Sequence, residues 1–453
     1  MNEFPTEALL LHLLAMAGML SVVCYLLHRR GLFHWLSAGF WMAGALALYF
    51  FLTPLMNWLT GQTSYLETRL AVSGGVPRLQ WVTFMIVMGA ACFYGAYFNT
   101  RLKPVTSGVR DDRLPAGTWI IMTLALLAAA YAIIMFRGSF AVTRDQVVIE
   151  GGEFTGDVTG YQYVAHMLAL FPLVLMLAYK KTRKLGLVLT ACYVIVRFED
   201  GWDRYSIVSL LLAISMLTVS LKRKQWPDKK WISVIALIVL ILTLRGHSGL
   251  LDYWRSDTIG VTAAEETITG GGDTGMLGTL WVHTFLCDRS GYNYGVPFLN
   301  HVLFGFLPRK YFPWKDTVIE PVATIEISNV YPEAVGMMSG AKSTVIGDLY
   351  SWGGLLTVAL GMACLGYLSR RLDGMVADTA PLPTRMLGFL WLGAVWMLFA
   401  SALTWVAANL FLIALPFFGL YLCDKLFDGQ RKTLPENLAK RMVASLPDTG
   451  RVK

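Results

Sequence analysis

The chain has 453 residues, of which 55% are hydrophobic and only 15% are charged, and its mean hydropathy is +0.53. These values exclude an ordinary soluble globular protein and are typical of an all-α polytopic membrane protein. The net charge of +8 does not indicate a nucleic-acid partner, because most basic residues are expected to lie along one membrane face.

The N-terminal segment is predicted to be a membrane helix that stays in the protein. Its first apolar stretch runs from Ala8 to Leu27 and follows two acidic residues, Glu3 and Glu7. A cleavable signal peptide begins with a basic region, which this stretch lacks. We therefore expect the stretch to span the bilayer.

The apolar segments predict a bundle of about 11 transmembrane helices, or 13 if residues 276–307 cross the bilayer twice. A bilayer core takes about 20 apolar residues as helix. On that basis the predicted spans are 7–27, 31–53, 79–99, 117–136, 161–179, 185–198, 205–221, 231–244, 344–368, 385–400 and 402–422.

Basic clusters follow alternate spans and therefore fall on one side of the membrane. By the positive-inside rule this side is cytoplasmic, which places the N-terminus on the outer side of the membrane and the C-terminus in the cytoplasm. The predicted regions are an N-terminal bundle of about eight spans (1–244), an external loop with two interfacial or re-entrant helices (245–343), about three C-terminal spans (344–424) and a basic cytoplasmic tail (425–453).

No metal or other cofactor is expected from the sequence. The six cysteines lie mostly inside apolar segments without metal-ligand spacing, and they are interpreted as small core residues. The chain also has no phosphate-binding glycine loop and no zinc-protease or serine-hydrolase motif.

Two outer loops before the long one carry candidate binding residues. Arg144 lies just beyond a predicted span, where it either binds an anion or pairs with Asp145. In the tight turn before the seventh span, Arg204 is the strongest candidate for an anion contact, and Asp203 is a candidate proton acceptor. Ionisable residues at membrane depth are functional hypotheses by default, although this turn is also compatible with a self-neutralising ion network.

The long external loop carries most of the remaining candidates. Arg245 and Arg255 lie near its start, and its middle places an Asp288-Arg289 ion pair beside Tyr292 and Tyr294. Aromatic faces next to carboxylate, amide and guanidinium groups are typical of a sugar site. The alternative is the aromatic belt that any membrane interface carries.

Two further segments predict chemistry at the outer membrane surface. Pro308 and Pro313 stiffen the chain around Arg309 and Lys310, which predicts a site for a lipid pyrophosphate or, alternatively, ordinary anchoring to anionic headgroups. Asp348 lies in the first turns of the ninth span, where a carboxylate either caps the helix or accepts a proton in catalysis.

Several of these motifs together resemble the Wzy-type oligosaccharide repeat-unit polymerases, with the enterobacterial common antigen branch nearest in layout. The resemblance covers most of the chain as topology and some short motifs as sequence. The motifs are Arg144, the turn Gly201-Trp-Asp-Arg204, the segment Leu307-Pro-Arg309-Lys310 and the stretch Thr344-Val-Ile-Gly-Asp348-Leu-Tyr-Ser-Trp-Gly-Gly354.

The resemblance implies a GT-C-like membrane glycosyltransferase of the bacterial inner membrane that needs no cofactor. Such enzymes join repeat units carried on undecaprenyl pyrophosphate at the periplasmic face, and they work beside a flippase and a chain-length regulator. The arginines that would hold the two pyrophosphates are Arg144, Arg204, Arg245, Arg289 and Arg309. A base for the acceptor hydroxyl would be Asp348 or Asp203.

Two other functions stay open at this point. An O-antigen ligase type shares the architecture but transfers glycan to a lipid core sugar. A lipid-linked oligosaccharide flippase would instead line a central path with cationic residues, whereas these charges collect on one face. The oligosaccharyl- and mannosyltransferase type expects an acidic pair in the first outer loop, where this chain has only Glu67.

Overall fold

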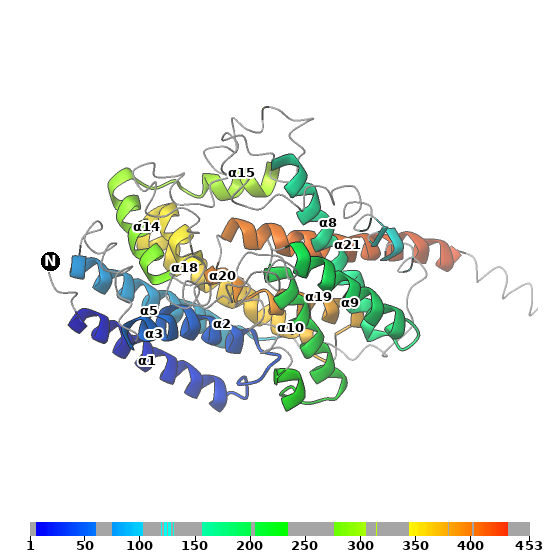
Figure 1. Ribbon diagram of the computed structural model, residues 1–453, viewed down its shortest axis with the longest axis horizontal. Helices are drawn as coiled ribbons and strands as arrows, with labels where there is room; N and C mark the ends of the chain where they lie inside the picture. The colour runs from blue at the N-terminus through cyan, green and yellow to red at the C-terminus, as the bar shows by residue number, and fades with distance from the viewer. Residues whose placement is uncertain are drawn as a thin grey trace, which may run out of the picture.

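The computed structural model describes residues 6–59, 75–102, 156–200, 204–233, 276–304, 344–378, 380–400 and 403–433, together with single positions between 119 and 130 and residue 314. All regular secondary structure within these residues is helical (Figure 1). The coarse prediction of an all-α protein is therefore confirmed over the described part of the chain.

Described helices overlap most of the predicted apolar segments, whereas the predicted spans 117–136 and 231–244 lie largely outside the described residues. In chain order the helices are α1 (Thr6–Arg29), α2 (Ala38–Ala47), the π-helical turn η1 (Leu48–Leu52), α3 (Thr53–Leu59), α5 (Gly75–Asn99), α8 (Gly156–Ala178), α9 (Arg183–Asp200), α10 (Arg204–Leu221), α14 (Met276–Ser290), α15 (Val296–Phe304), α18 (Val345–Val376), α19 (Leu382–Gly393), α20 (Met397–Ala400) and α21 (Leu403–Thr433).

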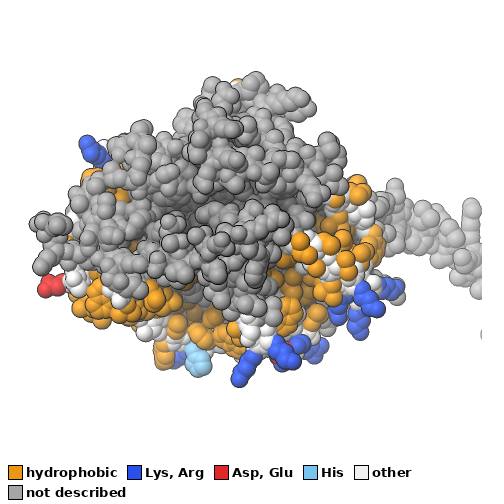
Figure 2. Space-filling model, viewed as in Figure 1, with side chains coloured by type: hydrophobic (Ala, Val, Ile, Leu, Met, Phe, Trp, Pro, Cys, Tyr) orange, Lys and Arg blue, Asp and Glu red, His pale blue; other side chains and the backbone are white. Residues whose placement is uncertain are grey.

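Four of the described helical segments are long and apolar enough to cross a membrane: Thr6–Arg29, Ala38–Leu59, Gly75–Asn99 and Val345–Val376. Three shorter apolar helices lie within α8, α10 and α21. The surface over the described helices is largely hydrophobic (Figure 2). The protein is therefore a helical membrane protein, while the count of 11 spans stays a prediction.

The second span begins later than the sequence predicts. Gly31 adopts a left-handed backbone conformation (φ 65°), and the side chain of Ser37 accepts a hydrogen bond from the backbone N–H of Phe40 as an N-cap. These two features end the preceding turn and start a new helix at Ala38, because serine at an N-cap satisfies an otherwise unpaired donor. The span then continues to Leu59 through the π-helical turn.

Helices α5 and α18 form the tightest pair in the core. A Cβ atom on Gly366 would lie 2.1 Å from the carbonyl oxygen of Phe93, so the two backbones meet where no side chain fits. On the same contact, Gly89 faces Val358 and Met362. Small residues allow membrane helices to approach closely and gain van der Waals contact.

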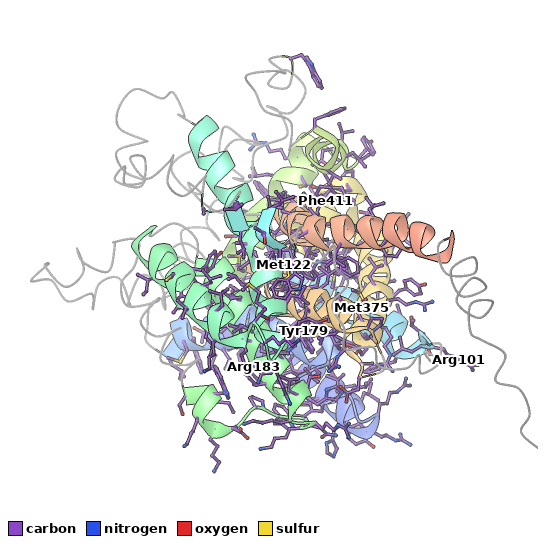
Figure 3. All side chains as sticks on the ribbon, turned by 90° about the vertical axis from the view of Figure 1, so that its right-hand side faces the viewer. Arg101, Met122, Tyr179, Arg183, Met375 and Phe411 are labelled. Carbon is purple, nitrogen blue, oxygen red and sulfur yellow. The ribbon has the colours of Figure 1, made fainter. Side chains whose placement is uncertain are left out.

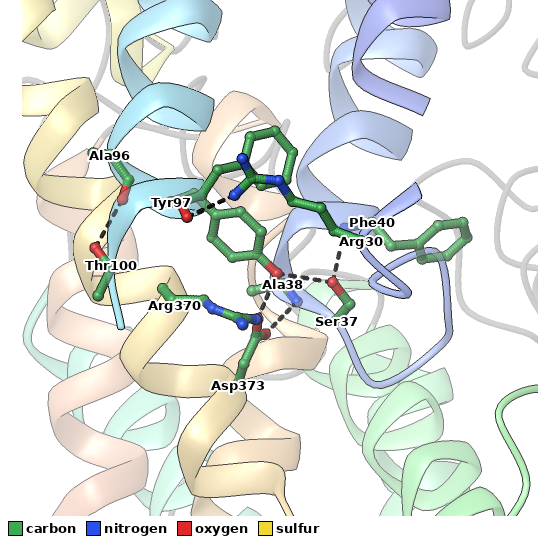
Figure 4. Close-up of polar contacts among 10 residues, drawn as sticks. Arg30, Ser37, Ala38, Phe40, Ala96, Tyr97, Thr100, Arg370 and Asp373 are labelled. Carbon is green, nitrogen blue, oxygen red and sulfur yellow. Dashed lines mark hydrogen bonds and ion pairs between the residues drawn. The ribbon is translucent and has the colours of Figure 1, made fainter. Parts of the chain in front are cut away.

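A buried polar network joins α2, α5 and α18 at one end of the bundle (Figure 4). One carboxylate oxygen of Asp373 accepts a hydrogen bond of 2.8 Å from the backbone N–H of Ala38. The other accepts from Tyr97 and from Arg370, and Tyr97 also bonds Ser37. Asp373 thus serves as a cap for α2 from a distant part of the chain.

Other contacts at this end join segments that the sequence places on the cytoplasmic side. Arg30 donates to the carbonyl oxygen of Phe98 at 2.7 Å, and the backbone N–H of Trp35 donates to the carbonyl oxygen of Gln225 at 3.0 Å. Lys and Arg side chains gather along the lower edge of the molecule in Figure 2. These contacts bring together helix ends that the sequence assigns to one side, and the orientation in the membrane stays a prediction.

Nearly all buried hydrophobic side chains of the described helices belong to one large core, and Ile207 and Leu211 form a small separate cluster. In Figure 3, Met122 and Tyr179 lie among the packed helices, whereas Arg101 lies at the margin of the molecule. Met122 is only 2% exposed. The core fixes the relative positions of the helix ends, and at the end opposite to the Asp373 network these ends carry the candidate site.

Candidate functional site at the outer end of α18

The candidate site lies where α5, α14 and α18 meet. Helices α14 and α15 occupy the region in which the sequence predicts two interfacial or re-entrant helices, and the segment 291–295 separates them (Figure 1). Gly291, Tyr294 and Gly295 in this segment all have positive φ angles. A tyrosine in that conformation is uncommon and is strained by a modest amount.

Asp288 is the centre of the site. One of its carboxylate oxygens lies 2.5 Å from Arg78 at the start of α5, and the other accepts a hydrogen bond of 2.6 Å from the hydroxyl of Tyr350 in α18. The Arg78 side chain is 16% exposed and that of Asp288 is 33% exposed. Three helices therefore converge on one carboxylate that remains accessible.

The sequence predicts an ion pair between Asp288 and Arg289, but the structure pairs Asp288 with Arg78. Adjacent residues on a helix point in different directions, so their side chains do not face each other. Arg289 is exposed.

The 291–295 segment is bound directly to α18. The backbone N–H of Asn293 donates to the carbonyl oxygen of Ser351 at 2.8 Å, and its side-chain amide donates to the Ser351 hydroxyl at 3.1 Å. The Asn293 side-chain oxygen in turn accepts from the backbone N–H of Gly295. The ring of Trp352 packs against Gly295.

Helix α18 is broken next to these contacts. Gly353 and Gly354 leave the helical conformation, and Gly354 has a φ of 71°, which favours glycine. The hydroxyl of Thr357 donates to the carbonyl oxygens of Leu349 and Gly354 at 2.5 and 2.9 Å. Backbone groups that a break releases inside a membrane need such partners. The break is therefore a supported feature of the helix.

Asp348 lies one turn before the break. Thr344 caps α18 by accepting from the backbone N–H of Gly347 at 3.2 Å, and Asp348 accepts from the backbone N–H of Leu403 at 2.5 Å. Asp348 thus joins the start of α18 to the start of α21. The sequence allowed Asp348 to cap its own helix, but Thr344 is the N-cap of α18, and Asp348 instead accepts from the first backbone N–H of α21. The role of Asp348 as a base stays a prediction.

His283 lies behind the site. It is 5% exposed, and burial lowers its pKa from the ordinary value of 6.5 to about 4. A Cβ on Gly347 would lie 2.7 Å from the Nδ1 atom of His283, so the imidazole fills the space beside the first turn of α18. We interpret His283 as a neutral packing residue.

The structure brings together some of the predicted site residues. Arg289, Tyr292, Tyr294 and Asp348 lie at this end of the bundle; Tyr292 is 40% exposed and Tyr294 is 77% exposed. Arg204 begins α10, but its side chain is outside the described part. The other candidates also lie outside the described residues; they are Arg144, Asp203, Arg245, Arg255, Arg309 and Lys310.

Sequence reasoning did not single out Arg78, Tyr350 or Asn293. Arg78 follows Pro77 in the first turn of a membrane helix. A charged residue at such a helix end could have been noted as a candidate from the sequence. The position alone does not distinguish a binding residue from a basic side chain that only extends to the membrane–water interface.

Within the described ranges, no cluster of three or more His, Cys, Asp or Glu side chains is arranged to hold a metal ion. Comparison of the chain with protein-family models, with curated proteins and with solved structures found no match.

Proposed function

We propose that this chain is a membrane glycosyltransferase that polymerises undecaprenyl-pyrophosphate-linked repeat units at the periplasmic face of a bacterial inner membrane. The observation that supports this most is the cluster of Arg78, Asp288 and Tyr350, at the bundle end predicted to be external. Carboxylate, hydroxyl and amide groups beside half-exposed aromatic rings suit a hydroxyl-rich substrate at a membrane surface.

The proposed reaction needs no oxidant or reductant. A hydroxyl oxygen of the acceptor repeat unit forms a bond to the anomeric carbon of the donor glycan. The bond between that carbon and the pyrophosphate oxygen breaks, and undecaprenyl pyrophosphate leaves with the electron pair. The hydroxyl proton passes to a carboxylate, for which Asp348 or Asp203 is the candidate.

The arginines have a distinct part in this reaction. Pyrophosphate is already a good leaving group, so the enzyme mainly has to stabilise the charge that develops on it. A preorganised donor in a water-poor site contributes about 3 kcal/mol to such stabilisation, and a positioned base contributes roughly 100-fold in rate. The candidates for pyrophosphate binding are Arg144, Arg204, Arg245, Arg289 and Arg309.

A deletion strain tests the proposal through the chain length of its surface polysaccharide. Loss of a polymerase is expected to leave single repeat units on the surface. Loss of a flippase would leave none, and loss of a ligase would leave polymer on its lipid carrier. Either of the last two results would refute polymerisation as the function.

Complementation of the deletion strain then tests the arginines. Arg204→Ala and Arg309→Ala are expected not to restore long chains, whereas Arg371→Ala is expected to restore them. Arg371 is the matched control, because it is an exposed arginine at the opposite end of α18. Full-length polymer from both outer variants would remove the pyrophosphate assignment.

A further inference from the structure

The geometry points to Asp288 as a glycan-binding residue that accepts hydrogen bonds from sugar hydroxyls, in a subsite formed with Arg78, Tyr350 and Tyr292. This inference rests on the proposed function, and it adds which residues bind the sugar part of the substrate. The subsite takes the sugar part of the lipid-linked substrate, while the pyrophosphate is bound by the candidate arginines, including the neighbouring Arg289, whose side chain points in a different direction from that of Asp288.

The carboxylate of Asp288 is oriented but still accessible. Arg78 holds one oxygen and Tyr350 holds the other, and Arg78 is itself placed over the ring of Phe285, 5.8 Å from its centroid. An ionised carboxylate offers about four acceptor positions, so these two contacts leave capacity for a ligand. With 33% of its side chain exposed, Asp288 is open to one.

Aromatic rings flank this carboxylate. Tyr292 is 40% exposed and lies 6.0 Å from the ring of Tyr350, centroid to centroid. Trp81 is 36% exposed and lies three residues after Arg78 on α5, where residues at this spacing share a helix face. A ring with an open face covers the apolar side of a sugar while the carboxylate takes its hydroxyls.

Electrostatics favours a sugar over a phosphate at this place. Arg78 is the described cation in contact with Asp288, and the carboxylate already balances its charge. A phosphate that approached Arg78 would meet the negative charge of Asp288 within a few ångströms, and like charges at such a distance repel strongly. A neutral sugar hydroxyl is not repelled by the carboxylate and can donate a hydrogen bond to it.

A purely structural role explains the cluster less well. Partly exposed ion pairs contribute little to stability in most proteins, and the surrounding α5, α14 and α18 residues already pack through a continuous apolar core. The carboxylate, guanidinium and phenol come from three separate helices. Such convergence at an accessible position is typical of a binding group.

Binding of two lipids to the purified full-length protein tests the inference. One probe is the undecaprenyl-pyrophosphate-linked repeat unit extracted from the deletion strain, and the other is undecaprenyl pyrophosphate without glycan. We expect Asp288→Asn to weaken binding of the glycan-bearing lipid by about ten-fold or more, as loss of a hydrogen bond to a charged group does. Binding of the glycan-free lipid is expected to stay unchanged.

If Asp288→Asn weakens the binding of both lipids equally, or changes the binding of neither, the inference is overturned. If Asp288→Asn does not fold, Tyr292→Leu replaces it in the same binding test, because Tyr292 is outside the ion pair. It is likewise expected to weaken binding of the glycan-bearing lipid only. Asp228→Asn is the matched control: this carboxylate pairs with Lys222 and Lys224 at the opposite end of the molecule. It is expected to bind both lipids as the wild type does.

The wild-type protein separates this inference from the proposed function. If it binds neither lipid, the proposed function fails and the subsite fails with it. If it binds both lipids equally, only the subsite assignment fails, because the proposed enzyme also binds its product, undecaprenyl pyrophosphate. If it prefers the glycan-bearing lipid and Asp288→Asn keeps that preference, only the subsite assignment fails.

Discussion

Burial of His283 makes the stability of the folded protein depend on pH. The imidazole lies beneath the first turn of α18, and burial lowers its pKa to about 4. In the unfolded chain the same group titrates near 6.5. Between these two pH values the unfolded state binds more protons than the folded state, so folding becomes less favourable as pH falls.

We therefore predict that the protein loses stability on acidification partly through His283. Because of His283, the free energy of unfolding falls by at most about 1.4 kcal/mol for each pH unit below 6.5, until the pKa of the folded state is reached. His283→Gln is expected to reduce the difference between the melting temperatures at pH 7 and pH 5, measured by intrinsic fluorescence in detergent. His28→Gln, at an exposed position, is expected to keep the full difference, and an equal difference in all three proteins would contradict the prediction.

At the same scale, Gly354 supports the break in α18. Its φ of 71° and ψ of −147° are essentially restricted to glycine, and a Cβ atom there would lie 3.0 Å from the hydroxyl of Tyr292. Gly44 is a helical glycine with nothing within 4 Å of such an atom, so it offers a matched comparison.

Gly354→Ala is expected to destabilise the protein by about 1–3 kcal/mol through backbone strain, whereas Gly44→Ala is expected to have little effect. The measurement is the melting temperature of each purified variant. Similar melting temperatures for Gly354→Ala and the wild type would show that the break does not depend on glycine.

Between elements, the α5–α18 contact depends on a glycine with no room for a side chain. The oxygen that a Cβ on Gly366 would meet belongs to the backbone of Phe93, which cannot rotate away as a side chain does. The helices would have to separate along the contact, and Gly89 and Met362 would lose their packing.

Gly366→Ala is therefore expected to destabilise the protein by about 1–3 kcal/mol, as overpacking of a well-packed core does. Gly95→Ala is the control, because this glycine lies on α5 with nothing within 4 Å of its Cβ position. Detergent-solubilised yield and melting temperature measure both variants. A normal yield and melting temperature for Gly366→Ala would show that the backbones are not in contact there.

The same elements show what hydropathy can and cannot predict. Apolar length alone predicts α1 and α5, and it locates the span that contains α18. It does not predict the break, because two adjacent glycines are compatible with a continuous helix. The break depends on Thr357 and Asn293, whose contacts form only in the folded chain.

The site is less predictable than the helices for a related reason. Arg78 and Asp288 are separated by 210 residues, and apolar periodicity carries no information about which helices become neighbours. Asp348, Tyr292 and Tyr294 could be named as candidates because each lies near the end of an apolar segment, and their roles in binding or catalysis stay predictions. The pairing of Asp288 with Arg78 required the packing of α5 against α14.

For the whole molecule, the central prediction is the orientation in the membrane. The contacts at the Asp373 end join segments assigned to the cytoplasm, and the Asp288 site lies at the other end. In a background without cysteine, Tyr294→Cys is expected to react with a membrane-impermeant maleimide in spheroplasts. Lys230→Cys is expected to react only after permeabilisation, because both side chains are exposed and the two residues are predicted to lie on opposite sides of the membrane. The reverse pattern would invert the topology and move the site to the cytoplasm.

The cap that Asp373 provides for α2 has a consequence for synthesis of the protein. The two bonded residues are 335 positions apart, which a ribosome covers in on the order of half a minute. During that interval α1, α2 and α5 are already made, while the helix that completes their polar and apolar contacts is not. We expect the early helices to wait at the insertion machinery as an incomplete group, so a ribosome stalled before Asp373 would yield a substrate for quality-control proteases.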